Sequence, residues 1–283
     1  MQGFPSLINS GLVWLQGSDI KGKFCFYQKT KHAFKDKYII HQGKTRFAVP
    51  YDQWCFWKTL GPEGYYLDEM LPFCQHINQE LQDFTLFDLG ADVGVVSNLV
   101  AIHCSGLKNI IAFEPNPKSY ELLKLNSEMS KIPFKAEHQA VSSFDGKVRF
   151  EFDDTVASDH EGHIDINREG DTQVTSLDSY IKISDSVSPK QLVIKIDVEG
   201  QELEVIKGAK ELIKQSDKTI ILLEIHPNTL ERDGLTPEAI FEELEKIRGV
   251  NWQVPLLEKS VDRSLTFFEQ FPLQQYDLIA TTV

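Results

Sequence analysis

The chain has 283 residues, of which 41% are hydrophobic and 25% are charged, so it can bury one large core and carry a small extension. Its formal net charge of -13 argues against nucleic acid as the main partner, because phosphates need a basic surface. No apolar run is long enough for a membrane span, and the apolar residues near the N-terminus lack the basic segment of a secretory signal.

The first 75 residues predict a small extension of mixed helix and strand over a main domain at 76–283. Three short aromatic and β-branched segments predict strands: Phe24–Tyr27, Tyr38–Ile40 and Arg46–Val49. An aromatic turn at Trp54–Trp57 precedes a predicted helix from Tyr66 to about Leu81. Aromatic side chains in this region could stack on a substrate, although packing against a sheet is their commoner role.

Beyond this point, predicted strands alternate with helices. The expected strands are Thr85–Leu89, Asn109–Phe113, Phe134–Val141, Val148–Phe152, Leu192–Ile196, Thr219–Ile225 and Tyr276–Ala280. The expected helices follow Gly94 and span Tyr120–Met129, Glu202–Lys214 and Thr236–Arg248. The polar stretch from Asp153 to Thr172 predicts a loop or a solvated hairpin. This alternation is typical of an α/β protein with a mainly parallel sheet covered by helices on both faces.

The segment Asp88–Gly94 reads Asp-Leu-Gly-Ala-Asp-Val-Gly and joins the first of these strands to a helix. Gly90 permits a sharp turn, and Gly94 lets the helix begin close to a ligand. A strand, a glycine loop and a helix N-terminus together predict a nucleotide-type site, with free backbone N–H groups directed at the ligand.

The residues of this loop indicate which kind of nucleotide binds. The dinucleotide fingerprint G-x-G-x-x-G fails because Asp92 replaces its second glycine, and the Gly-Lys-Ser/Thr of a P-loop is missing. The carboxylates of Asp88 and Asp92 would repel a pyrophosphate but suit an ammonium and a sulfonium. Glu114 follows Gly90 by 114 − 90 = 24 positions, near the spacing at which an acid holds ribose hydroxyls. S-adenosylmethionine meets all these requirements.

Several motifs then occur in a characteristic order: Asp88–Gly94, Ala112–Asn116, Ser176–Asp178, Lys195–Gly200 with Glu202–Gly208, and Leu223–His226. From about Trp57 to Pro227 the chain resembles the FkbM family of S-adenosylmethionine-dependent methyltransferases. It departs from the family pattern at Asp92, which is usually Asn, and at Ser142–Gly146, where the family commonly has Ser-Asp-x-x-Gly. The resemblance implies a Rossmann-like class I methyltransferase fold with a seven-stranded sheet, and O-methylation of sugars, glycans or natural products.

Ligands of open parallel sheets bind at the carboxyl ends of the strands. The residues expected to contact the cofactor there are Asp88, Gly90, Ala91, Asp92, Gly94, Glu114, Pro115, Asn116, Gln139, Ala140 and Asp197. Gln139 and Ala140 are assigned from fold analogy, beside the adenine.

The expected catalytic residues are His226, Asp197 and Glu199. Asp197 with Glu199, and Glu224 with His226, form two pairs spaced by two residues, which share one side of the chain if the backbone remains extended. Methyl transfer to a hydroxyl requires positioning and removal of a proton, and a histidine is well suited to the second task. His226 is the candidate base, with Asp197 or Glu199 as its orienter or as an alternative base.

A divalent ion held by Asp197, Glu224 and His226 is an alternative to metal-free chemistry. Metal-free chemistry ranks higher because the sequence contains no local ligand motif. Glu199 and Glu224 could instead cap helices or satisfy loop N–H groups. The pair His160 and His163 predicts a solvated loop rather than a metal site.

The expected partner is a small-molecule or glycan acceptor, which we place against the N-terminal aromatics and the acidic stretch from Asp153 to Asp171. Two alternatives remain open: N-methylation of a small-molecule amine, and a non-catalytic cofactor-binding domain in a biosynthetic assembly. The four cysteines lack a C-x-x-C pair, so we expect reduced thiols and a cytoplasmic protein.

Overall fold

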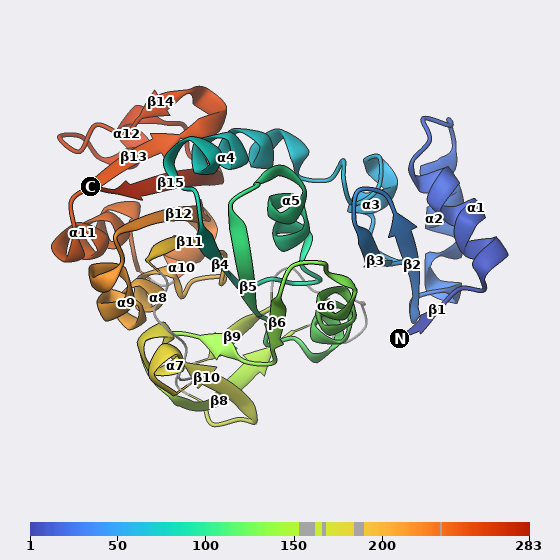
Figure 1. Ribbon diagram of the computed structural model, residues 1–283, viewed down its shortest axis with the longest axis horizontal. Helices are drawn as coiled ribbons and strands as arrows, with labels where there is room; N and C mark the ends of the chain where they lie inside the picture. The colour runs from blue at the N-terminus through green and yellow to red at the C-terminus, as the bar shows by residue number, and fades with distance from the viewer. Residues whose placement is uncertain (153–161, 166–167, 184–189, 233) are drawn as a thin grey trace.

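The computed structural model describes residues 1–152, 162–165, 168–183, 190–232 and 234–283, and within them an eight-stranded sheet forms the centre of the molecule (Figure 1). From edge to edge its strands are β14 (Lys259–Ser260), β13 (Val250–Val254), β15 (Tyr276–Thr282), β12 (Lys218–Ile225), β11 (Gln191–Ile196), β4 (Phe84–Leu89), β5 (Leu107–Phe113) and β6 (Phe134–Glu137). The neighbours from β12 to β6 are parallel, whereas β13, β14 and β15 pair antiparallel. The predicted α/β class is confirmed, and the short edge strand β14 brings the described sheet to eight strands instead of seven.

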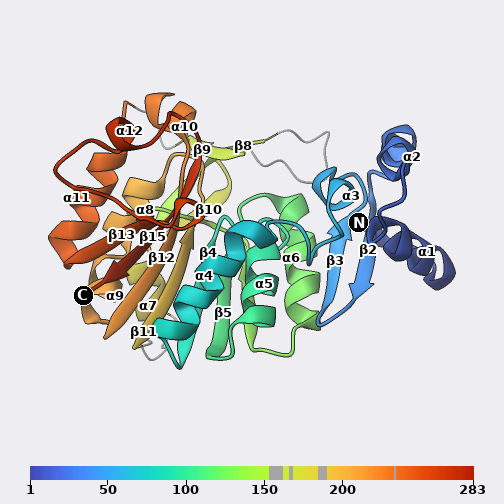
Figure 2. The same cartoon turned by 90° about the horizontal axis from the view of Figure 1, so that it is seen from above.

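Helices cover both faces of this sheet (Figure 2). One face carries α4 (Leu67–Glu80), α5 (Val95–His103) and α6 (Pro117–Met129). The other carries α7 (Leu177–Ile183), α8 (Glu202–Gly208), α9 (Lys210–Gln215) and α11 (Pro237–Ile247). Successive residues of β4 enter opposite layers, Leu86 the first and Phe87 the second, so this strand is buried along its whole length.

Two predicted elements are divided in the structure. The strand expected over Phe134–Val141 separates into β6, in the main sheet, and β7 (Ala140–Val141), in a small sheet. The helix expected over Glu202–Lys214 separates into α8 and α9 at Ala209. Gly208, which ends α8, lies so close to the chain at Ser142 that a Cβ would be 2.1 Å from the Ser142 carbonyl oxygen.

The small sheet has the order β7, β10 (Thr172–Thr175), β8 (Gly146–Glu151) and β9 (His163–Asp165). The predicted strand at Val148–Phe152 therefore belongs to this sheet, as β8, and not to the main one. The acidic stretch expected as a loop or a solvated hairpin contributes β9, which pairs antiparallel with β8, and the first residue of β10, while residues 153–161 and 166–167 lie outside the described part. The patterns also did not predict β13, α7, α10 (Pro227–Arg232) and α12 (Phe267–Gln270).

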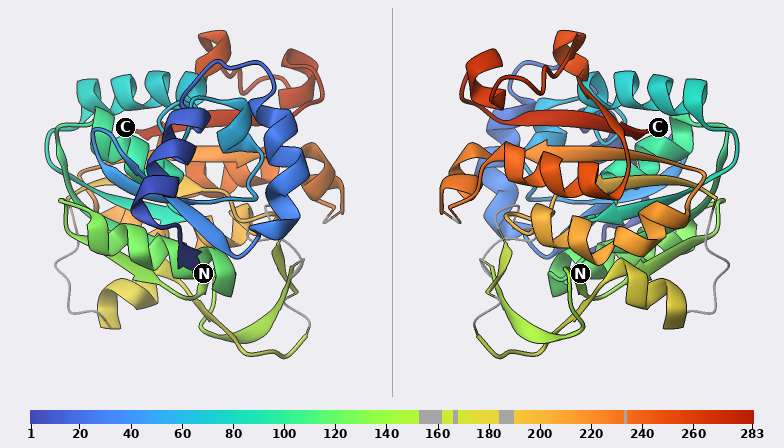
Figure 3. Two further views of the ribbon diagram at one scale, coloured as in Figure 1. Left: turned by 90° about the vertical axis from the view of Figure 1, so that its right-hand side faces the viewer. Right: turned by 90° about the vertical axis from the view of Figure 1, so that its left-hand side faces the viewer.

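The N-terminal segment covers one end of the molecule (Figure 3). It contains β1 (Gln2–Gly3), α1 (Ser6–Gln16), α2 (Lys23–Thr30), β2 (Lys37–Gln42), β3 (Arg46–Pro50) and α3 (Cys55–Lys58). The prediction of a strand at Phe24–Tyr27 is wrong, because these residues lie in α2. Their aromatic side chains favour a strand only weakly, and here Tyr27 instead stacks on Trp57 and donates a hydrogen bond to the Asp52 carbonyl at 2.6 Å.

The N-terminal sheet and the main sheet share one hydrophobic core. Buried Asn126 of α6 accepts from Ala48 N at 2.7 Å and donates to the carbonyls of Ala48 and Val93 at 2.9 and 2.8 Å. The boundary expected between residues 75 and 76 falls within α4. None of the helices in the described residues is long and apolar enough to cross a membrane.

Candidate functional site

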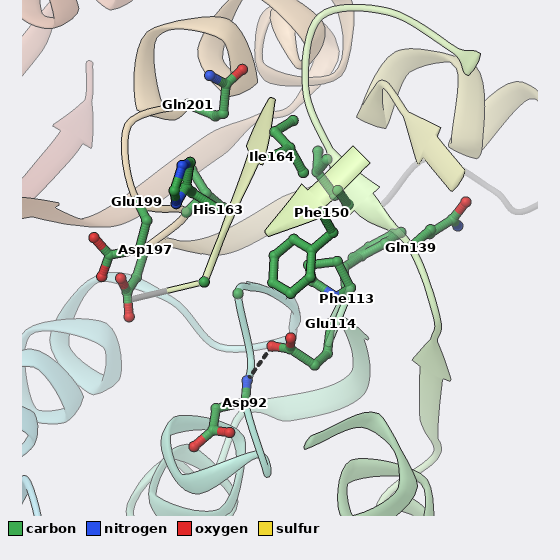
Figure 4. Close-up of a pocket in the computed structure, with 16 residues that line it drawn as sticks. Asp92, Phe113, Glu114, Gln139, Phe150, His163, Ile164, Asp197, Glu199 and Gln201 are labelled. Carbon is green, nitrogen blue, oxygen red and sulfur yellow. Dashed lines mark hydrogen bonds between the residues drawn. The ribbon is translucent and has the colours of Figure 1, made fainter. Parts of the chain in front are cut away.

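Two adjoining hollows lie at the carboxyl ends of β4, β5, β11 and β12. The inner hollow (Figure 4) has about 650 Å³ of space, including its open part, and is lined among others by Gly90, Asp92, Glu114, Pro115, Gln139, Ala140, His163, Asp197 and Glu199. The outer hollow has about 1940 Å³, including its open part, and shares several of these residues. Its further walls include Trp54, Tyr65, Tyr66, Ala91, Glu224, His226 and Arg232. This is the edge at which a sheet of this kind binds ligands.

The loop between β4 and α5 is shaped by Gly90. Its φ is 69°, and a Cβ there would lie 1.8 Å from the carbonyl oxygen of Asp197, so only glycine fits. The N–H groups of Gly90 and Ala91 donate to the end of β5 at 3.1 and 3.0 Å, and that of Asp92 donates to Glu114 Oε2 at 2.7 Å. The expectation that the loop offers free N–H groups to a ligand is therefore wrong for these three residues.

Three of the predicted cofactor residues line neither hollow: Asp88, Gly94 and Asn116. Asp88 is fully buried, and its Oδ2 accepts from the N–H and the hydroxyl of Ser97 at 3.1 and 2.6 Å. Its carboxylate therefore caps α5 from beneath the loop. Gly94, with φ 90°, precedes α5, and Asn116 caps α6 with its side-chain oxygen.

Glu114 follows β5 and accepts two backbone hydrogen bonds, of which Figure 4 shows the one from Asp92. Its Oε2 accepts from Asp92 N and its Oε1 from Asn116 N, each at 2.7 Å. Burial, reinforced by the charge of Asp92, raises the pKa of Glu114 to about 8, although the two N–H donors oppose the shift. The two N–H donors thus fix the orientation of the carboxyl group. Hydrogen bonds from the hydroxyl groups of a ligand would favour its ionised form.

A buried lysine links the glycine loop to Asp197. Lys195 Nζ donates to the Gly90 carbonyl at 2.6 Å and lies 3.0 Å from Asp197 Oδ2. Burial opposes its charge, but Asp197 and Asp88 outweigh burial and raise the pKa of Lys195. Burial raises the pKa of Asp197 well above its usual range, against the influence of Lys195. Lys195 begins the motif Lys195–Gly200, but the sequence analysis gave it no role. A lysine in the apolar run Leu192–Ile196 is itself a signal, since it needs a carboxylate partner.

The two predicted pairs, Asp197 with Glu199 and Glu224 with His226, converge, but not for the reason expected. Glu199 has φ 52° and Gly200 has φ 107°, so the backbone after β11 turns instead of remaining extended. The turn still brings Glu199 to Asp197 and His226, with one potential ligand atom of each within 4.8 Å of the others. Among the described residues this group is competent to hold a metal ion, with Glu199 in the place where the sequence suggested Glu224.

His226 directly follows β12 and faces two carboxylates. Its Nε2 lies 3.1 Å from Glu224 Oε1 and 4.0 Å from Asp197 Oδ1. Burial alone would lower the pKa of His226, but Glu224 with Glu199 and Asp197 raises it to about 9. Burial works against the charge of Glu224 as well, and His226 nevertheless lowers the pKa of Glu224 to about 2. The two groups thus form an ion pair.

Other segments complete this part of the site, and the sequence motifs did not indicate them. Tyr66, which precedes α4, donates to Glu224 Oε1 at 3.3 Å, and Gln275 Nε2 donates to the same oxygen. Burial, with Glu224, raises the pKa of Asp277 to about 7. Arg232 of α10 donates to the Glu199 carbonyl at 2.9 Å.

The small sheet forms the remaining wall of the inner hollow through Phe150, His163 and Ile164 (Figure 4). His163 therefore belongs to the site rather than to a solvated loop, while His160 lies outside the described residues. Asp145 accepts from Thr175 Oγ1 and from Ser176 N, each at 3.0 Å, within the small sheet.

A family model and a known relative both match this chain. The family model of the methyltransferase FkbM domain matches residues 88–250. Hexuronic acid methyltransferase AglP of Haloferax volcanii is 29% identical over 152 residues, which are 54% of this chain and 60% of that protein. The match thus spans less than two thirds of this relative.

Two solved structures are also similar. Methyltransferase FkbM from Methylobacillus flagellatus is 16% identical, with coverage of 95% of this chain and 61% of that one and a TM-score of 0.45. The SAM-dependent methyltransferase from Agrobacterium tumefaciens is 9% identical, with coverage of 87% and 70% and a TM-score of 0.44.

Proposed function

The chain belongs to the FkbM methyltransferase family, whose model matches more than half of it, and on this premise we propose that it transfers a methyl group from S-adenosylmethionine to a hydroxyl group of a sugar, glycan or natural product. One observation carries the proposal: at the glycine loop the N–H donors of residues 90–92 are used internally, while carboxylates line the space. Such a site suits a cation with hydroxyl groups and is unfavourable for a pyrophosphate.

The residues of the inner hollow fit the cofactor. Glu114, fixed by two N–H donors, is placed to accept from ribose hydroxyls, and Asp92 and Asp197 offer negative charge to an ammonium or a sulfonium. Gln139 and Ala140 line the hollow beside the small sheet, where we assign the adenine. S-adenosylmethionine supplies, when bound, a methyl group on a positively charged sulfur.

The outer hollow is our candidate for the acceptor site. Trp54, Tyr65 and Tyr66 supply aromatic surface for the apolar faces of a sugar ring, and Glu224 with His226 supplies polar groups for its hydroxyls. Because a matched relative is a hexuronic acid methyltransferase, we favour an acceptor that contains a uronic acid. Arg232, which also lines this hollow, is suited to its carboxylate.

Proton removal is assigned to His226. The acceptor proton moves to Nε2 of the imidazole, and Glu224, whose Oε1 lies 3.1 Å from this nitrogen, stabilises the resulting imidazolium. A pKa of about 9 keeps His226 protonated at neutral pH, but a positive charge brought close to it lowers this pKa towards neutrality. Asp197, whose pKa is also raised, is the alternative base.

We propose that the chemistry is metal-free, because Lys195 and His226 already balance Asp197 and Glu224. The alternative is a divalent ion on Asp197, Glu199 and His226. Activity that is lost with a chelator and restored by added Mg²⁺ or Mn²⁺ would reverse this proposal, whereas unchanged activity supports it.

The experiment that tests the function incubates the protein with methyl-labelled S-adenosylmethionine and a panel of uronic-acid glycans, neutral glycans and small amines. We expect label in a glycan, with the uronic-acid members methylated fastest. Label in an amine would establish N-methylation. Cofactor binding without transfer to any panel member would favour the non-catalytic alternative.

A further inference from the structure

A separate cavity lies between the turn of the β2–β3 hairpin, the first turns of α5 and the C-terminal end of α6, which stand side by side in Figure 2. We call it the hairpin cavity; it has about 1070 Å³ of space, including its open part. It shares no lining residue with the two hollows of the candidate site. Residues 95 and 96 of α5 line the outer hollow, whereas residues 97 and 98 line the hairpin cavity, so this helix separates the two spaces.

The hairpin cavity has a charge opposite to that of the whole chain. Its lining residues include Lys44, Arg46 and Lys131 and no carboxylate, although the chain carries a formal net charge of -13. Among the described residues, none of these three side chains forms an ion pair. The carboxylate of Glu63 binds the backbone N–H of Lys44 at 3.0 Å but does not line the cavity. Three cations around one space favour an anionic ligand.

The cavity also contains a buried hydrogen-bond donor without an acceptor. Asn98 is 7% exposed, and its Oδ1 accepts from Thr45 Oγ1 at 2.5 Å. Its Nδ2 has no partner in the described part of the chain. Buried donors of native proteins normally find an acceptor, in the protein or outside it.

Besides polar residues such as Thr45 and Ser130, six residues with apolar side chains line the cavity: Phe47, Ala101, Ile110, Met129, Ile132 and Phe134. A small inorganic anion would leave this surface uncovered. A ligand with both a charged end and an apolar body would use both kinds of wall.

We propose that the hairpin cavity binds an amphiphilic anion. Its oxyanion, a carboxylate or a phosphate, pairs with Lys44, Arg46 and Lys131 and accepts from Asn98 Nδ2. Its apolar body packs against the wall formed by Phe47, Ile110 and Phe134. This site is independent of the methyl-transfer site and does not rest on its function.

Calorimetric titration of the full chain with hexyl phosphate, hexanoate, inorganic phosphate and hexanol tests the proposal. We expect one or both amphiphilic anions to bind at least about tenfold more tightly than inorganic phosphate or hexanol, and the tighter of the two identifies the oxyanion. Arg46→Gln should weaken this binding about tenfold, and Asn98→Asp should abolish it, whereas Lys210→Gln, at an exposed position of α9, should leave it unchanged.

Circular dichroism establishes whether the two cavity variants are folded. If Asn98→Asp does not fold, the affinity of Arg46→Gln alone tests the proposal. Three results would overturn the proposal: neither amphiphilic anion binds, hexanol binds as tightly as hexyl phosphate, or the affinity is unchanged in Arg46→Gln.

Discussion

The carboxyl group of Glu114 connects the geometry of the inner hollow to a measurable pH dependence. Its folded pKa is about 8, raised chiefly by burial, so it is largely protonated at neutral pH. Hydroxyl donors of a ligand favour the ionised form, so binding below pH 8 must release a proton. Affinity therefore rises with pH as far as about 8 and then levels off.

Titrations of S-adenosylmethionine in buffers of different ionisation enthalpy measure this proton release directly. In Glu114→Gln we expect an affinity about tenfold lower and no pH dependence. A wild-type affinity that stays constant from about pH 6 to 9 would contradict the role of Glu114.

His226 predicts a different pH dependence, in turnover rather than in binding. A base must lose its proton before it acts, so kcat should rise with pH through an apparent pKa between the ordinary 6.5 and about 9. His226→Asn should reduce kcat by about 10²- to 10⁴-fold and change cofactor affinity little. His32→Asn, at an exposed position, serves as the control. Full turnover in His226→Asn at every pH would transfer the role of base to Asp197.

At the scale of single elements, the loop after β4 depends on the close approach of Gly90 to Asp197. A Cβ at Gly90 would collide with a backbone oxygen, and φ is 69° there, so Gly90→Ala should lower the free energy of unfolding by about 3 kcal/mol. Gly11→Ala is the matched control, since that glycine lies inside α1 with nothing within 4 Å of the added carbon. There we expect a gain of about 0.5–1 kcal/mol. Equal changes in urea unfolding of the two variants would contradict the packing argument.

The elements that the sequence predicted well are those whose own pattern determines their place. The buried strands β4, β11 and β12 are mostly apolar. Residues just after parallel strands must share one edge, which is why Asp92, Glu114, Asp197 and His226 come together. Local patterns fail where tertiary contacts decide. Aromatic residues of α2 pack on Trp57 as a helix, and the chain after β6 moves to a second sheet.

The same limit applies to the site. Tyr66 and Glu224 are 158 positions apart, and no local spacing relates them. Glu199 reaches Asp197 through a turn with positive φ, which a glutamate rarely adopts and which the pattern therefore could not predict.

At the scale of the whole molecule, the N-terminal segment is part of the same core as the sheet. Asn126 satisfies the N–H and carbonyl of Ala48 and the carbonyl of Val93 in a buried position. Asn126→Ala leaves these groups without partners and should cost about 3 kcal/mol of unfolding free energy. Asn251→Ala, at an exposed position of β13, should cost less than about 0.5 kcal/mol. Urea unfolding that gave the same midpoint for both variants would mean that the N-terminal segment is not joined to the core in this way.

The shared core also bears on function, because Trp54 and Tyr66 from the N-terminal region line the same outer hollow as His226. The most direct test of the whole account is therefore the product of the reaction. The protein is incubated with ¹³C-methyl S-adenosylmethionine and a uronic-acid oligosaccharide, and the product is followed by carbon NMR, beside His226→Asn. The account predicts a methyl resonance on a sugar oxygen that is nearly absent with the variant. No transfer by a protein that binds the cofactor, or a methyl group on nitrogen, would contradict it.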